Sequence, residues 1–240
     1  MRIAIISDIH GNLTAFEAVL ADLKDTGPDL VIHGGDLATN GARPAMIVDR
    51  IRELGWPCVM GNTDELLVRP ESLETFASQS TAPAALWEAI RKIAAAAREA
   101  LGEGRLSWIN ELPESHVELS LALVHASPGD LWRVPPAETS KSDLEKIYGV
   151  LDRPLIIHGH THVPSTRSLA NGRLLIDTGS VGLPYDGDPR ASYLLLDDNV
   201  PSIRRVEYSV EREVEALSSS GLPHSAWIEK MLRSASPQLP

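Results

Sequence analysis

The chain has 240 residues, of which 43% are apolar and 23% are charged. This length and composition are those of a folded globular protein with room for a substantial core, and they exclude a disordered chain. The net charge of −11, from 22 Lys and Arg against 33 Asp and Glu, argues against a surface that coats nucleic acid. The single cysteine, Cys58, excludes an internal disulfide and is consistent with a reducing compartment.

The chain starts with MRIAIISDIH, whose apolar run is too short for the hydrophobic region of a signal peptide. No apolar run reaches the about 20 residues that are needed to span a bilayer. We therefore expect a cytoplasmic protein with no membrane partner. A small phosphorylated substrate is compatible with the acidic charge, because bound metal supplies local positive charge. The sequence leaves a homo-oligomeric state open.

The first part of the chain alternates between predicted strands and helices. Short apolar runs at Ile3–Ile6, Leu30–His33 and Pro57–Met60 are typical of buried strands. Apolar residues at helical spacing predict helices over Asn12–Lys24 and Ala42–Leu54. The short connections between these elements indicate βαβ units and a largely parallel sheet.

A helical segment is predicted at about residues 65–115. The Ala-rich stretch Thr81–Leu101 has helical periodicity, and it continues through a break that contains glycine into Leu106–Leu112. We expect this segment to belong to a single domain that spans residues 1–240.

The second half contains mostly strand candidates, namely Val117–His125, Leu155–His158, Leu174–Asp177, Ala191–Asp197 and Ile203–Tyr208. Few long helices separate them, which indicates a second sheet with antiparallel character that packs on the first as a sandwich flanked by helices. Near the end, Glu211–Leu217 and Ser225–Arg233 are predicted helices, and the tail Pro237–Pro240 is expected to fray.

Metal-capable side chains lie at or just after the ends of predicted strands: Asp8, His10, Asp36, Asn62, His125, His160 and His162. Open α/β sheets place their sites at the carboxyl ends of strands, so these side chains are expected to converge. Carboxylate and amide oxygens mixed with imidazoles, without thiolate, suit two adjacent divalent ions of the Mn, Fe, Ni, Co or Zn type. Two such ions about 3.5–4 Å apart are the usual device for in-line attack on phosphorus. The pattern therefore predicts phosphoester hydrolysis.

Each of these motifs also has a structural explanation when it is taken alone. Asp8 and Asp36 are compatible with helix caps, Asn62 with an ordinary turn and His125 with a loop histidine. The GHTH motif at residues 159–162 is the strongest single indication of a metal site, because its two imidazoles can each bind a different ion. The agreement of every motif with a strand end favours the metal interpretation.

The order D-x-H, GGD, GN-x-D, H, GHTH over residues 8–162 resembles the calcineurin-like metallophosphoesterase superfamily. The segment from Thr178 to Tyr193 extends this likeness and is similar to the small bacterial and archaeal phosphodiesterase branch. The resemblance implies an α/β fold, specifically a four-layer α/β/β/α sandwich in which two mixed β-sheets are flanked by helices. It also implies a dinuclear site at the strand ends and a metal-activated water as nucleophile.

The resemblance further implies which residues hold which ion. One ion is assigned to Asp8, His10, Asp36 and His162, and the other to Asp36, Asn62, His125 and His160. Asp36 is then the bridging carboxylate, which suits a residue with two anionic oxygens between two cations. Asp36 and Asn62 are the positions taken as catalytic, and replacing either is expected to abolish hydrolysis.

One position departs from the usual pattern of this family. Many members read GNH-D or GNH-E, whereas this chain has Thr63 in place of the histidine. A threonine hydroxyl donates a hydrogen bond but has no useful pKa near 7. Substrates whose leaving group departs without much protonation, such as activated diesters or anhydrides, are therefore expected to lose the least hydrolysis rate from this replacement.

Three residues are candidate substrate contacts: Asn12, Thr63 and Arg133. Asn12 is also well suited to cap the helix that follows it, and capping preferences favour that role. Arg133 is equally compatible with a surface ion pair.

The leading hypothesis is a dinuclear, metal-dependent phosphoesterase that cleaves phosphodiester bonds of small molecules, with nucleotides among the candidates. One alternative is a phosphomonoesterase or nucleoside polyphosphate hydrolase on the same site. Another is a non-catalytic scaffold of the same fold, since a fold alone does not determine function.

Overall fold

The computed structural model describes residues 1–240 and contains two mixed β-sheets. The four-stranded sheet has the order β2-β1-β8-β9, with β1 (Arg2–Ile6), β2 (Leu30–His33), β8 (Ala191–Asp197) and β9 (Val200–Val206). The five-stranded sheet has the order β3-β4-β5-β7-β6, with β3 (Ser115–Glu118), β4 (Leu121–Val124), β5 (Leu155–His158), β6 (Ser165–Ser168) and β7 (Leu174–Asp177). Strands β1 and β2 are parallel, as are β4, β5 and β7, and the other pairs are antiparallel.

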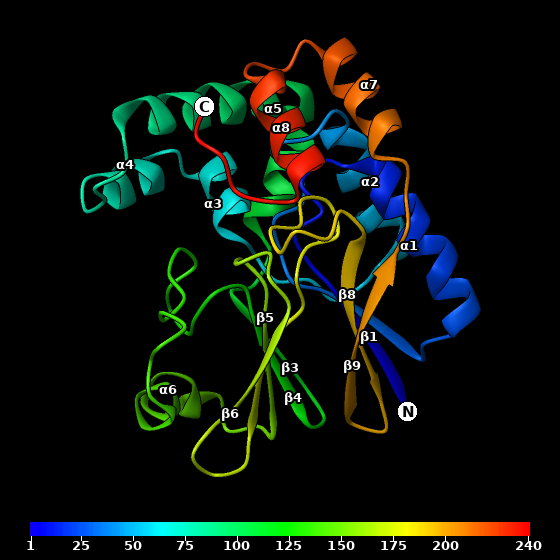
Figure 1. The fold of residues 1–240 in the computed structure, drawn as a ribbon, viewed down its shortest axis with the longest axis vertical. Helices are drawn as coiled ribbons and strands as arrows, with labels where there is room; N and C mark the ends of the chain where they lie inside the picture. Colours follow the sequence, from blue (N-terminus) through cyan, green and yellow to red (C-terminus); the bar gives the residue numbers. More distant parts are fainter.

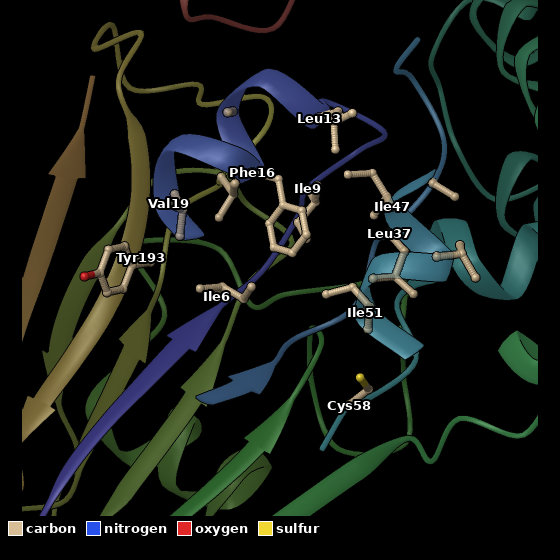
Figure 2. Close-up of a cluster of buried hydrophobic side chains, with 14 of the residues drawn as sticks. Ile6, Ile9, Leu13, Phe16, Val19, Leu37, Ile47, Ile51, Cys58 and Tyr193 are labelled. Carbon is tan, nitrogen blue, oxygen red and sulfur yellow. The ribbon is translucent and has the colours of Figure 1, made fainter. Parts of the chain in front are cut away.

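Helices α1 (Leu13–Thr26) and α2 (Pro44–Leu54) cover the outer face of the four-stranded sheet. Figure 2 shows Phe16 of α1 and Ile51 of α2 in the same buried apolar layer as Ile6 of β1. Apolar residues recur along both helices at the spacing of one helix face, which turns that face toward the sheet.

The two sheets pack face to face through every second residue of their strands. Ile5 of β1 belongs to the same buried cluster as Leu123 of β4 and Ile157 of β5. Ile156 points the opposite way and packs with helix α6 (Lys141–Tyr148). From one side to the other the layers are α1 with α2, the four-stranded sheet, the five-stranded sheet and α6 (Figure 1). This is the four-layer sandwich that the resemblance implies.

The remaining helices are α3 (Asn62–Val68), α4 (Glu71–Ala77), α5 (Ala84–Asn110), α7 (Val210–Ser220), α8 (Ser225–Ser234) and the short 3-10 helix η1 (Gly149–Leu151). Helices α3, α5 and α8 lie beyond the carboxyl end of β1, at the top of Figure 1. Helix α5 contains the predicted break at Gly102, whose φ of 67° interrupts the helical backbone. None of the helices combines the length and the apolar character that would let it cross a membrane.

The predicted division of strands between the two sheets is wrong for the last pair. β8 and β9 do not join the second sheet, because β8 pairs antiparallel with β1, where Leu194 lies opposite Ile5. The first sheet is therefore mixed and is completed by the C-terminal part of the chain. Local periodicity predicts that a segment is a strand, but it contains no information about which distant strand is its partner.

Three predicted strands have different boundaries in the structure, and one of them, Ile203–Tyr208, is shifted because β9 spans Val200–Val206. Val117–His125 is a hairpin rather than one strand, since β3 and β4 flank a turn in which Leu119 has a φ of 47°. Pro57–Met60 runs beside β2 but makes only one bridge, between Cys58 and His33. Proline has no N–H to donate to a ladder, so it shortens the pairing of this segment.

Some elements escape the sequence reading. Helix α6 and the edge strand β6 have no counterpart among the predicted elements, whereas α4 lies within the helical segment predicted at about residues 65–115. The tail Pro237–Pro240 is exposed and has no regular secondary structure, and one hydrogen bond, from Trp227 Nε1–H of α8 to the carbonyl oxygen of Gln238 at 2.9 Å, links it to α8. Figure 1 shows this tail running from α8 toward α3 and α5.

Candidate metal centre

The loops after β1, β2 and β5 bring four predicted ligands into one buried group, namely Asp8, His10, Asp36 and His162. Each offers a ligand atom, and these atoms all lie within 4.8 Å of one another. Backbone hydrogen bonds fix the loops to each other, since Asp8 N–H donates to Gly35 O and His10 N–H donates to Asp36 O, both at 3.0 Å. The convergence expected at the strand ends is therefore present.

Asp36 faces the two halves of the cluster with different oxygens. Its Oδ2 lies 3.5 Å from His10 Nε2, and its Oδ1 lies 3.5 Å from His125 Nε2. Thr63 N–H donates to Oδ1 at 2.9 Å and fixes the rotation of the carboxylate. The two oxygens of Asp36 therefore face different histidines of the cluster.

Asn62, His125 and His160 form the second half of the cluster. Asn62 Oδ1 lies 2.9 Å from His125 Nε2 and 2.9 Å from His160 Nδ1. His125 Nδ1 lies 2.8 Å from Gly34 O, and it must donate because a carbonyl oxygen only accepts. In the neutral ring, the form that binds metal, His125 Nε2 then directs a lone pair at the Asn62 oxygen. Two acceptors at this distance repel unless a cation lies near both, so this half fits a metal ion.

The first half of the cluster fits a cation for a similar reason. Asp8 Oδ1 is buried and has no hydrogen-bond partner, which is costly for a carboxylate oxygen. His162 Nδ1 donates to Leu183 O at 2.6 Å, so its Nε2 directs a lone pair toward Asp8 Oδ1, 3.3 Å away. His10 Nε2 lies 3.1 Å from the same His162 nitrogen. A divalent ion held by Asp8, His10 and His162 would give these facing acceptor atoms a common partner.

Burial keeps two of the imidazoles neutral. It lowers the pKa of His10 to about 4, although the charge of Asp36 partly opposes it. Burial, followed by the charge of His125, lowers the pKa of His160 to about 4. Both rings are therefore unprotonated at neutral pH, the form in which histidine binds metal.

Backbone strain is concentrated in the same loops. Five predicted ligands have left-handed φ values, namely Asp8 (57°), His10 (50°), Asp36 (60°), His160 (69°) and His162 (61°). Residues other than glycine avoid this region, which costs of order 1–3 kcal/mol for each residue and is found most often at functional sites. The fold therefore holds these side chains in place against their local backbone preference.

Two glycines allow the loops to approach the ligands closely. A Cβ on Gly61 would lie 2.1 Å from Asp36 Oδ1, and a Cβ on Gly159 would lie 2.4 Å from Asp8 Oδ2. No side chain fits at either position without displacing a ligand oxygen.

Asp64 is the main residue whose role the sequence does not determine, since it fits either a ligand-orienting residue or a helix first turn. The structure shows that it is fully buried and ties two ligand loops together. Its Oδ2 accepts from Asp36 N–H at 2.7 Å and from Gly61 N–H at 3.0 Å, and its Oδ1 accepts from Leu37 N–H at 3.0 Å. Burial and the charge of Asp36 raise the pKa of Asp64 to about 7 despite these three bonds.

The candidate substrate contacts differ in their positions. Thr63 lies at the centre and its hydroxyl oxygen is buried without a partner. The amide of Asn12 is already engaged as a helix cap, because it accepts from Ala15 N–H at 2.9 Å and donates to Gly182 O at 2.8 Å.

Arg133 lies apart from the cluster. Its guanidinium donates to Asp130 and Gln79 and stacks over the Phe76 ring, with 5.0 Å to the ring centroid. It contacts none of the predicted ligands.

Other residues at the centre have no local sequence signal. The Tyr185 ring stacks on the His162 ring with 4.4 Å between centroids and 24° between planes. Thr39 Oγ1 lies 3.3 Å from His10 Nδ1. Ser180 Oγ donates to Asp8 O at 2.8 Å, which holds the first ligand loop.

Known proteins resemble this chain over most of its length. A family model described as a calcineurin-like phosphoesterase superfamily domain matches residues 1–199. An uncharacterized protein of Methanocaldococcus jannaschii is 31% identical, with 96% of each chain covered. Phosphodiesterase YfcE of Escherichia coli is 27% identical over 85% of this chain and 91% of its own. The crystal structure of a metallophosphoesterase from Sphaerobacter thermophilus covers 98% of this chain and 99% of that chain, with a TM-score of 0.77 and 28% identity. These matches confirm the resemblance seen in the sequence, including its small bacterial and archaeal branch.

Proposed function

This chain belongs to the calcineurin-like phosphoesterase superfamily, a group of hydrolases, and we propose that it cleaves phosphodiester bonds of small substrates with two divalent ions held in the candidate metal centre. One observation carries the proposal: the two oxygens of Asp36 face the two histidine-containing halves of the cluster, 3.5 Å from His10 Nε2 and 3.5 Å from His125 Nε2. The unpartnered Asp8 Oδ1 and the facing acceptors at Asn62 support cations on both sides.

Bound divalent ions supply Lewis acidity, which lowers the pKa of water and neutralises phosphate charge. The chain holds the candidate ligand side chains in position. Asp36 is held by Thr63 N–H, and its loop is held by the buried carboxylate of Asp64. Since two of the imidazoles are neutral by burial, they are ready to bind without losing a proton.

Thr63 shapes the chemistry of the leaving group. Its hydroxyl is buried and unpartnered, so it is available to donate a hydrogen bond to a substrate oxygen. It does not supply a proton at neutral pH as an imidazole would. We therefore place activated diesters ahead of monoesters with poor leaving groups.

The test is hydrolysis of bis(p-nitrophenyl) phosphate by the protein loaded with Mn. Replacement of Asp36 by Asn or of Asn62 by Ala is expected to reduce turnover to background, because each removes a ligand from the centre. Asp143→Asn is the matched control, since Asp143 is an exposed residue of α6. Turnover near the wild-type rate in either site variant contradicts the mechanism.

The other functions are separated by substrate and metal content. A higher kcat/KM for monoesters or nucleoside polyphosphates than for diesters would replace the proposed activity by one of these on the same site. Absence of bound metal even after Mn addition would favour a non-catalytic scaffold.

A further inference from the structure

A cavity of about 340 Å³ opens beside the metal centre. Asn62, a predicted ligand, forms part of its wall. Two further wall residues touch other predicted ligands, because Thr39 Oγ1 lies 3.3 Å from His10 Nδ1 and the Tyr185 ring stacks on the His162 ring. A group attached to a phosphorus atom at the metal centre therefore has this space next to it.

The cavity wall contains no charged side chain. Nine of its 15 residues are hydrophobic, and its polar residues include Thr39, Asn62 and Thr63 on the side of the metal centre. The apolar part is formed by α3, α5 and α8, with Leu66, Ile90 and Trp227 among its residues. The cavity is thus polar near the metal centre and apolar away from it, as is typical of a small-molecule site.

The C-terminal tail contributes to the wall of this space. Pro237, Gln238 and Leu239 line the cavity, and the hydrogen bond from Trp227 Nε1–H to Gln238 O at 2.9 Å holds the tail against α8. Figure 1 shows the tail leaving α8 and running toward α3 and α5. The helical segment and the tail therefore wall a space that the two sheets alone do not form.

We propose that this cavity binds the organic group of the substrate, and that the substrate class is phosphoesters with one uncharged, largely apolar substituent. The inference rests on the proposed function, because it requires the phosphorus to sit at the metal centre. It predicts that the site prefers apolar esters to nucleoside polyphosphates, since the wall has no Lys or Arg to bind a second phosphate group.

The probes are three phosphonates that share one head group and differ in the organic group, namely methylphosphonate, phenylphosphonate and 4-carboxyphenylphosphonate. Binding to the Mn-loaded protein is measured by calorimetry. Phenylphosphonate is expected to bind at least about tenfold more tightly than methylphosphonate, because the ring leaves water for an apolar wall. The carboxylate of the third probe is expected to remove this gain, since a charge buried without a partner is costly.

Variants test whether the preference for phenylphosphonate over methylphosphonate arises in this cavity. Ile90→Glu and Leu86→Glu each place a carboxylate in the wall and are expected to remove the preference for phenyl over methyl. The second variant serves if the first does not fold, because Leu86 lies near the start of α5 and is only partly buried. Ile147→Glu is the matched control: the same change at an exposed isoleucine of α6 is expected to keep the preference.

The inference is overturned if the wild type binds methylphosphonate and phenylphosphonate equally, or binds neither. It is also overturned if both cavity variants keep the phenyl preference or if Ile147→Glu loses it. The binding measurement needs no turnover, whereas failure of the proposed function appears as absent hydrolysis of bis(p-nitrophenyl) phosphate. The two failures are therefore distinguishable.

Discussion

Replacing Asp64 tests whether the ligand loops are positioned by a buried carboxylate. Asp64 accepts three backbone N–H groups, from Asp36 at 2.7 Å, Leu37 at 3.0 Å and Gly61 at 3.0 Å. In Asp64→Ala all three donors lose their acceptor. In Asp64→Asn one carboxylate oxygen becomes an NH₂ group, so at least one buried donor faces another donor.

The magnitudes decide which property to measure. Each buried N–H that loses its partner costs about 1–3 kcal/mol. The same substitutions remove a buried carboxyl whose pKa is raised to about 7, and this relief offsets part of the cost in stability. Stability is therefore an ambiguous readout, whereas metal affinity depends on the geometry of the loops. Partners of this kind typically contribute about 10–100-fold to metal affinity.

The assay is a calorimetric titration of metal-free protein with Mn. We expect Asp64→Asn to lie near the lower end of that range and Asp64→Ala near the upper end. The matched control is Asp130→Asn, because Asp130 also accepts two backbone N–H groups, those of Trp132 and Arg133, but contacts no predicted ligand. Wild-type Mn affinity in Asp64→Ala would refute the reasoning.

Three further predictions concern close packing, pH and the leaving group. Gly61→Ala places a Cβ 2.1 Å from Asp36 Oδ1, so elemental analysis is expected to show a lower Mn content than in the wild type. Gly104→Ala is the control, because a Cβ added at Gly104 has no neighbouring atom within 4 Å. Burial lowers the pKa of His158 to about 4, so its stabilising effect is complete above about pH 6.5 and is lost as pH falls toward 4. His158→Gln is therefore expected to flatten the slope of unfolding free energy against pH in that window by up to about 1.4 kcal/mol per unit. Thr63→His is expected to raise kcat/KM for phenyl esters more than for p-nitrophenyl esters, because an imidazole protonates a poor leaving group.

Each of these predictions has an outcome that contradicts it. Full Mn content in Gly61→Ala would mean that the close approach to Asp36 is not needed for binding. An unchanged pH slope in His158→Gln would mean that this histidine is not held neutral in the folded state. Equal effects of Thr63→His on both classes of ester would mean that leaving-group protonation does not limit the rate.

The sequence predicts the fold class and places the candidate ligands at strand ends, but it does not predict every strand pairing around them. Asp36 and the other candidate ligands can be recognised in the sequence because each follows an apolar run, and the carboxyl ends of strands are where such sheets place ligands. The pairing of β8 with β1 is not visible, because it joins residues about 190 positions apart and no local pattern encodes it. The role of Asp64 is also hidden, since its partners are backbone groups that every sequence has.

The cavity beside the centre shows a third kind of limit. Ile90 and Trp227 look like ordinary core residues in the sequence, as apolar residues at helical spacing usually are. Only the arrangement of α5, α8 and the tail shows that these side chains line a space next to Asn62. The proposed substrate preference thus depends on tertiary structure, whereas the candidate metal ligands are already recognisable from the order of motifs in the sequence.

The most direct test of the central claim is electron paramagnetic resonance combined with metal analysis on the Mn-loaded protein. We expect two Mn ions per chain with the spectrum of an exchange-coupled pair, because the two oxygens of Asp36 face the two halves of the cluster. Asp36→Asn is expected to lose the coupling. A single uncoupled Mn in the wild type, or a coupled pair that persists in Asp36→Asn, would contradict the claim.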